Sequence, residues 1–153
     1  MAIGRDERRS HYRYALAIPT RWMDNDVYGH VNNVVYYSYF DTVVNEYLMR
    51  QGVLDYRQGE VVGFVVETSC QYHRPLRFPD VVEAGLRVAR IGNSSVRYEV
   101  GLFRQGDDDP AATGHFVHVY VKRPGLLPTP LPPGLRAALE RILSAESAAP
   151  KSP

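Results

Sequence analysis

The chain has 153 residues, of which 44% are apolar and 23% are charged, and its formal net charge is +1. This balance is ordinary for a globular protein, and it provides no global field to attract nucleic acid or an anionic membrane. The length suits a single domain with one core, which we place at residues 1–145, followed by a flexible tail at residues 146–153.

Cys70 is the only cysteine, so no disulfide can form within the chain, which suits a reducing interior. No stretch of the sequence approaches the roughly 18 apolar residues that a membrane span needs. The charged first residues also lack the apolar core of a secretory signal. We therefore expect a cytoplasmic protein without a membrane span.

The first predicted element is a strand over residues 12–22. Tyr12, Tyr14, Leu16 and Ile18 stand at alternate positions, which is the side-chain period of a strand. Pro19 cannot donate to a strand neighbour, so we expect this strand to end there or to lie at a sheet edge.

A helix is predicted over residues 33–50. Tyr36, Phe40, Val43 and Tyr47 follow helical spacing, and Gly52 provides a stop signal directly after the pattern. The other faces of this segment are also rich in apolar residues. A helix of this kind is normally buried, so other elements must wrap it.

Four later segments combine β-branched and aromatic residues and are separated by turn signals. The last two turns are short, so the strands that they join are antiparallel neighbours. A proline-rich connector and a short helix at residues 135–143 end the pattern. The four segments are Val61–His73, Val81–Ile91, Ser95–Arg104 and Ala112–Arg123.

The expected fold class is α+β, with a curved antiparallel sheet of five strands around one long central helix and a short C-terminal helix. A sheet with this much apolar surface and free edges also invites pairing with a second copy of the chain. His115 and His118 are expected on opposite faces of the last strand, so they do not form a pair.

The stretch RWMDNDVYGHVNN, at residues 21–33, directly precedes the predicted helix. One interpretation is a helix cap, with Asn32 or Asn33 accepting from the first N–H groups. Asp24 or Asp26 would then complement the helix dipole. Capping explains one acid and one asparagine, but it does not explain the Gly-His pair between them.

A metal site is not predicted here. The spacing of DNDVYG resembles a calcium loop, but its fifth position is Tyr28 and its twelfth is Val35, where acidic or amide ligands are needed. Asp24, Asp26 and His30 offer too few ligands for a transition metal.

A second interpretation is an active site at the helix N-terminus. The first N–H groups of a helix lack partners and favour negative charge, so they can stabilise an oxyanion. Asp26 supplies a carboxylate beside them, and Gly29 allows a tight turn. This combination suits acyl transfer, with a thioester carbonyl as a plausible target.

The segment DNDVYGHVNNVVYYSYFDTVVNEYL resembles the signature of hotdog-fold acyl-CoA thioesterases of the 4-hydroxybenzoyl-CoA thioesterase family. It is also similar to the D-x-D-x-N-x-H-V-N-N segment of plant acyl-ACP thioesterases, which share that fold. The resemblance covers residues 12–123 and includes the later landmarks YHRPLRFPDVV and NSSVRYEV. It implies hydrolysis of an acyl-CoA thioester, with no cofactor because coenzyme A is part of the substrate.

The resemblance also implies roles for single residues. Asp26 matches the catalytic carboxylate, acting as nucleophile or as general base for water. Asn33 matches the helix-start position whose backbone N–H polarises the carbonyl. His30 matches a motif histidine of the plant enzymes, and it could equally be a structural hydrogen-bonding residue. Tyr28, beside Gly29, stands where those enzymes have asparagine.

In the family the active site lies at a dimer interface, so the resemblance implies a homodimer as the minimum unit, and we expect a homotetramer. Val65, Glu67 and Thr68 would reach the site from the partner subunit. Basic residues would bind the phosphates of CoA. The candidates are Arg74, Arg77, Lys122 and Arg123.

Two alternatives to thioester hydrolysis remain open. The first is a non-catalytic acyl-CoA-binding or regulatory module on the same fold, which would not need the carboxylate of Asp26. The second is a hydratase or dehydratase, in which His30 and Asp26 would transfer protons at a substrate carbon. Cys70 is expected to be a small buried residue and not a nucleophile.

Overall fold

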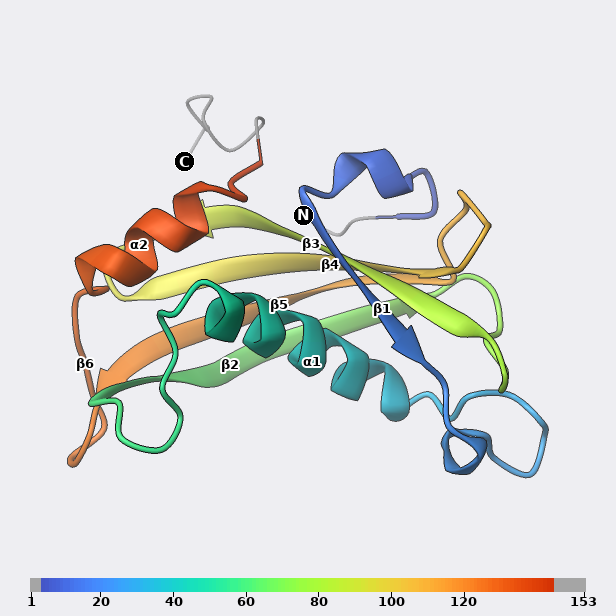
Figure 1. The fold of residues 1–153 in the computed structure, drawn as a ribbon, viewed down its shortest axis with the longest axis horizontal. Coiled ribbons are helices and arrows are strands. Elements are labelled where there is room, and N and C mark those ends of the chain that lie inside the picture. Colours follow the sequence, from blue (N-terminus) through green and yellow to red (C-terminus); the bar gives the residue numbers. More distant parts are fainter. Residues whose placement is uncertain (1–3, 145–153) are drawn as a thin grey trace.

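Five long antiparallel strands form one sheet that curls around helix α1 (Val35–Arg50), as Figure 1 shows. The computed structural model describes residues 4–144. Along the sheet the long strands follow the order β1-β3-β4-β5-β2. They are β1 (Tyr14–Pro19), β2 (Val61–Tyr72), β3 (Val81–Ile91), β4 (Ser95–Arg104) and β5 (Ala112–Lys122).

Short elements complete the fold. The 3-10 turns η1 (Arg9–His11) and η2 (Trp22–Asp24) flank β1. A two-residue strand, β6 (Leu127–Pro128), pairs with β5 and was not predicted, and helix α2 (Pro133–Glu140) follows it. Within residues 4–144, no helix is both long and apolar enough to cross a bilayer. The tail predicted at residues 146–153 lies outside the described residues.

The predicted order of elements is confirmed, with shifted boundaries. Strand β1 lies at the sheet edge and ends at Pro19, as the proline predicts, instead of running to Trp22. Beyond it, the Arg21 N–H donates to the Asp24 carboxylate (2.8 Å), and this bond closes a turn in place of the strand. Helix α2 ends earlier than predicted because the Ile142 carbonyl accepts a hydrogen bond from the Val88 N–H of β3 (2.8 Å), as in a pair of strands.

Helix α1 buries one long face against the sheet. Phe40, Val43 and Val44 are fully buried, whereas Asp41 and Arg50 on the other side are exposed. The prediction of a helix buried on most sides is therefore too strong. The polar residues among its apolar neighbours keep one face open.

The close approach of α1 to the sheet depends on a residue without a side chain. Phe40 of α1 lies over Gly114 of β5 and contacts Phe116 with ring centroids 5.6 Å apart. A Cβ atom at Gly114 would lie 2.6 Å from the Phe40 ring and 2.1 Å from the Ser69 carbonyl oxygen. A larger residue there would push the helix or β2 away, because packed interiors leave no space for it.

The face of β2 that meets α1 changes at a β-bulge. Register with β5 shifts between Val65 and Glu67. Thr68 is opposite Phe116 and so faces α1, whereas Glu67 points to the outer face and bonds His115. His115 and His118 lie on opposite faces of β5, as their spacing predicts.

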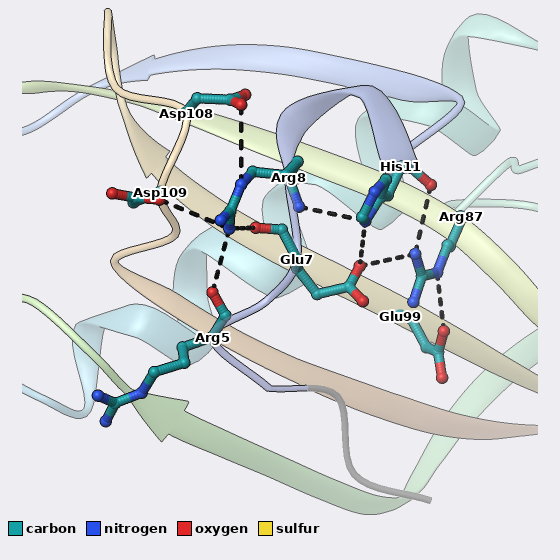
Figure 2. A network of polar contacts seen from close by, with 8 residues as sticks. All are labelled: Arg5, Glu7, Arg8, His11, Arg87, Glu99, Asp108 and Asp109. Carbon is teal, nitrogen blue, oxygen red and sulfur yellow. Dashed lines mark hydrogen bonds and ion pairs between the residues drawn. The ribbon is translucent and has the colours of Figure 1, made fainter.

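The outer face of the sheet carries a buried charge network under the N-terminal residues (Figure 2). Arg87 on β3 donates to Glu99 on β4 and to Glu7, each at 2.8 Å. The Tyr12 ring lies 4.7 Å from the Arg87 guanidinium carbon and covers Gly101, where a Cβ would approach the ring to 2.7 Å. The N-terminal segment is therefore an integral layer of the fold.

His118 is a buried histidine on the inner face of β5. Its Nε2 has no hydrogen-bond partner within residues 4–144, and its ring packs 5.0 Å from Tyr98 between centroids. Burial lowers the pKa of His118 to about 4. The folded protein therefore holds a neutral imidazole at neutral pH.

We predict that Gly114→Ala lowers the free energy of unfolding by about 1–3 kcal/mol, the usual cost of overpacking a core. Urea denaturation measures the loss. Gly134→Ala is the matched control, because the nearest atom to a new Cβ there is 3.8 Å away and the site lies in α2. Equal stabilities of the two variants would contradict the close helix–sheet contact.

We predict that His118 makes the protein less stable in mild acid. The unfolded chain takes up this proton near pH 6.5, whereas the folded chain takes it up only near pH 4, so stability falls as pH drops through that window. The loss approaches about 3 kcal/mol. Urea denaturation of wild type and His118→Leu across this range should give curves that diverge toward acid, and parallel curves would refute the prediction.

Candidate active site

The loop before α1 forms a tight turn around Asp26. The Gly29 N–H donates to the Asp26 carbonyl (3.0 Å), and the Asp26 N–H donates to the His30 carbonyl (2.9 Å). Gly29 has φ +82°, a conformation that residues with a side chain adopt only under strain. The turn therefore presents the half-buried Asp26 at a fixed place ahead of the helix.

The Asp26 carboxylate retains one free oxygen. Its Oδ1 accepts the Tyr28 N–H (2.8 Å), while Oδ2 has no hydrogen-bond donor within residues 4–144. The Tyr28 side chain is 84% exposed and takes no part in this contact. Asp26 is thus oriented by the backbone and still has an oxygen that can attack or accept a proton.

The other acid of the pair, Asp24, is structural. It is 1% exposed, and its carboxylate accepts from the Arg21 Nε (3.0 Å) and from the Tyr39 hydroxyl (3.0 Å). Burial alone would raise the pKa of Asp24, but these hydrogen bonds and the Arg21 charge lower it. Its carbonyl also accepts the Asn32 N–H (2.8 Å), so Asp24 ties η2 to the start of α1.

The start of α1 has a backbone amide without an acceptor among the described residues. The N-cap residue is Val34, which has no side-chain cap. The Asn32 Oδ1 accepts the Val34 N–H (3.2 Å), and the Asn32 carbonyl accepts the Val35 N–H (2.9 Å). The Tyr36 N–H donates to the Asn33 carbonyl (3.3 Å). Within residues 4–144, the Asn33 N–H has no acceptor, so this donor is available to a ligand.

A pocket of about 330 Å³ opens at this amide. Such a volume can hold a small organic group. The pocket brings together the helix start and the connection between β2 and β3. Its lining residues are His30, Val31, Asn33, Tyr36, Tyr72, His73, Arg74 and Pro75.

The two walls of the pocket are joined by hydrogen bonds. The Val31 N–H donates to the Leu76 carbonyl (2.7 Å), and both residues are buried. The Tyr72 hydroxyl donates to the Asn33 carbonyl (3.0 Å). Tyr72 was not predicted as a site residue. It lies on the same face of β2 as Thr68, and this face is turned toward the helix.

His30 is fixed by Arg77. The Arg77 guanidinium lies 3.4 Å from the His30 Nε2, and because a guanidinium only donates, that nitrogen is the acceptor. His30 lines the pocket with its Nε2 in this contact.

The structure brings some of the other expected binding residues to the pocket. Arg74 lines it and also forms an ion pair with Asp109 (2.8 Å), while Arg77 lies beside it against His30. Lys122 and Arg123 lie at the opposite end of the 12-residue β2 from Tyr72 within one chain. Val65 and Thr68 face the helix side of the sheet, whereas Glu67 faces outward, so these three do not form one group.

The sequence matches a known family over most of its length. The model of the thioesterase-like superfamily matches residues 20–139, and the chain belongs to that superfamily. The curled sheet with its long central helix is the predicted hotdog fold, which structural comparison confirms.

Several solved structures resemble this one. The PA5185 protein of Pseudomonas aeruginosa strain PAO1 is 52% identical, with a TM-score of 0.89 over 91% of this chain and 97% of that chain. The PA2801 protein of the same species is 30% identical, with a TM-score of 0.78 over 84% and 98%. The gentisyl-coenzyme A thioesterase BH1999 is 23% identical and shares the fold, with a TM-score of 0.73 over 82% and 99%.

We predict that Asp24→Asn lowers the free energy of unfolding by about 2–3 kcal/mol, because the buried carboxylate accepts from Arg21 and from the buried Tyr39 hydroxyl, and one oxygen of an amide cannot replace both carboxylate oxygens. Thermal or urea denaturation measures the effect. Asp26→Asn is the comparison, and it should cost less than about 1 kcal/mol, since only one backbone N–H depends on that side chain. The opposite ranking would contradict the structural role of Asp24.

Proposed function

We propose that this protein hydrolyses an acyl-CoA thioester to the free acid and coenzyme A. The observation that carries the proposal is the Asn33 N–H, which has no acceptor within residues 4–144 and belongs to a residue that lines the pocket. Asp26 lies in the loop directly before this residue, outside the pocket lining itself. Membership of the thioesterase-like superfamily supports the same reaction. The 4-hydroxybenzoyl-CoA thioesterase type is the branch that the DNDVYGHVNN string favours.

In the proposed reaction the thioester carbonyl lies against the Asn33 N–H. As charge develops on the carbonyl oxygen, this N–H and the helix dipole stabilise it. Asp26 either attacks the carbonyl carbon or takes a proton from the water that attacks it. The C–S bond then breaks, the thiolate of CoA leaves and takes up a proton, and in the first route water hydrolyses the acyl–Asp26 anhydride.

We propose that the working site needs a second copy of the chain, at least as a homodimer. β2 lies at a sheet edge, and its side chains Phe64, Val65 and Val66 are 47%, 49% and 59% exposed. An exposed apolar edge strand is a template for pairing. Val65 and Thr68 on its inner side are the residues that a second copy would add, and the tetramer and the cytoplasmic location stay predictions.

The pocket walls indicate which substrates to test first. Tyr36 and Tyr72 meet edge to face, with ring centroids 4.9 Å apart, and both line the pocket with His73. Flat aromatic walls suit a flat acyl group. The resemblance to the gentisyl-coenzyme A thioesterase agrees with this choice, so an aromatic acyl-CoA belongs in the substrate panel.

We predict that Asp26→Asn reduces kcat for thioester hydrolysis by about 10²-fold or more, the size expected for loss of a base or nucleophile. Thiol release from acetyl-CoA, palmitoyl-CoA and benzoyl-CoA measures the rate. Asp41→Asn is the matched control, because Asp41 is exposed on the far face of α1. A variant as fast as wild type would show that Asp26 only shapes the loop.

The same assay separates the alternatives. Tight binding of acyl-CoA without thiol release by the wild type would indicate a non-catalytic binding module. Addition of water to an enoyl-CoA would indicate a hydratase.

A further inference from the structure

The Asn33 carbonyl is held by a side chain from the sheet. The Tyr72 hydroxyl, at the end of β2, donates to this carbonyl at 3.0 Å. The Tyr72 ring is itself fixed against Tyr36 of α1, with an interplanar angle of 80°. The hydroxyl therefore approaches the helix start from a rigid position outside the loop.

Two successive peptide groups meet at Asn33. The Asn33 N–H shares a planar peptide group with the Asn32 carbonyl, which the Val35 N–H holds at 2.9 Å. The Asn33 carbonyl belongs to the next peptide group, and it accepts from the Tyr72 hydroxyl at 3.0 Å and from the Tyr36 N–H at 3.3 Å. Tyr72 thus supplies the better of the two bonds that fix the second peptide group.

An amide stabilises a developing oxyanion only when it points at the position that the oxygen will occupy. A neighbouring carbonyl that is free to turn would instead bring a partial negative charge toward the same place. The bond from Tyr72 keeps the Asn33 carbonyl engaged. Burial also raises the pKa of the Tyr72 hydroxyl, so it remains a donor at neutral and alkaline pH.

We propose that Tyr72 is a positioning residue whose hydrogen bond keeps the Asn33 carbonyl from turning toward the oxyanion that the Asn33 N–H binds. This inference rests on the proposed thioesterase function, in which that N–H binds the oxyanion. The ring of Tyr72 forms part of the pocket wall, whereas the hydroxyl acts through the backbone. The two contributions can be separated, because Tyr72→Phe removes only the hydroxyl.

The first measurement is steady-state hydrolysis by wild type and Tyr72→Phe on the best substrate among acetyl-CoA, palmitoyl-CoA and benzoyl-CoA. Removing an oxyanion donor costs about 10²–10³ in kcat, so a carbonyl released to turn toward the oxyanion, with the donor still present, should cost less, about tenfold. We expect kcat to fall by that amount while KM changes less than about twofold, since the ring that contacts substrate is retained. An unchanged kcat would overturn the inference.

The matched control is Tyr56→Phe. Tyr56 is 56% exposed in the loop after α1, beyond the C-terminal end of the 16-residue helix and so about 24 Å from its start. The same hydroxyl is removed there, and both kinetic constants should stay at wild-type values. An equal loss of kcat in this control would show that the effect of Tyr72→Phe is not specific, which would overturn the inference.

The second measurement needs no substrate. In ¹⁵N-labelled protein, the amide signal of Asn33 reports the orientation and hydrogen bonding of its N–H. Tyr72→Phe should shift this signal and change its hydrogen-exchange rate, whereas Tyr56→Phe should not. A fall in kcat without any change at the Asn33 amide would refute action through the backbone.

The two measurements distinguish the proposals from each other. If wild type releases no thiol from any of the three substrates, the proposed function fails. If wild type is active and Tyr72→Phe matches it in kcat, only the role of Tyr72 fails. A joint loss of kcat and change at the Asn33 amide, with KM retained, supports both.

Discussion

The backbone hydrogen bond between Val31 and Leu76 holds together the two segments that make the pocket. One segment precedes α1 and the other joins β2 to β3, so they are far apart in sequence. Side chains add to this bond: the Leu76 N–H also donates to the Tyr36 hydroxyl (3.4 Å), the Tyr72 hydroxyl donates to the Asn33 carbonyl, and Arg77 donates to His30. Among these contacts, the bond between Val31 and Leu76 is the shortest, and both of its residues are buried.

Asp24 and Asp26 have identical side chains, but their positions in the loop give them different surroundings. Asp24 is enclosed by Arg21 and Tyr39, so its charge is used to hold the loop. Asp26, two residues later, is bound by a single backbone N–H and keeps an oxygen free. A loop that must present a reactive carboxylate needs a rigid support, and here a second carboxylate provides it.

The sequence predicted the fold well because its periodicities are strong. Alternating apolar residues located the strands, and the spacing of Tyr36, Phe40, Val43 and Tyr47 located the helix. The resemblance directed attention to the Asn33 N–H, although only the structure shows that this amide lacks an acceptor. The roles assigned to the site residues themselves remain predictions that await the kinetic tests.

Other features of the site could not be predicted from the sequence. The sequence did not predict that Asp24 is buried, because its burial follows from the tertiary contacts with Arg21 and Tyr39. Glu67 and Thr68 were both candidates to reach the site from a partner subunit, and as adjacent residues of a strand they face opposite sides of the sheet. The contact of Tyr72 with Asn33 joins residues 39 positions apart, which no local pattern encodes.

The bulge in β2 changes which alternate residues of that strand face the helix. Before it, odd-numbered residues such as Val61 and Gly63 face the helix, and after it even-numbered ones such as Thr68, Cys70 and Tyr72 do. With strict alternation throughout, the hydroxyl of residue 72 would point away from α1. The extra residue in the middle of this edge strand, the exposed Val66, therefore turns Tyr72 to the side of the sheet that carries the pocket wall. We infer that the number of residues along β2 is constrained more tightly than the identity of residue 66.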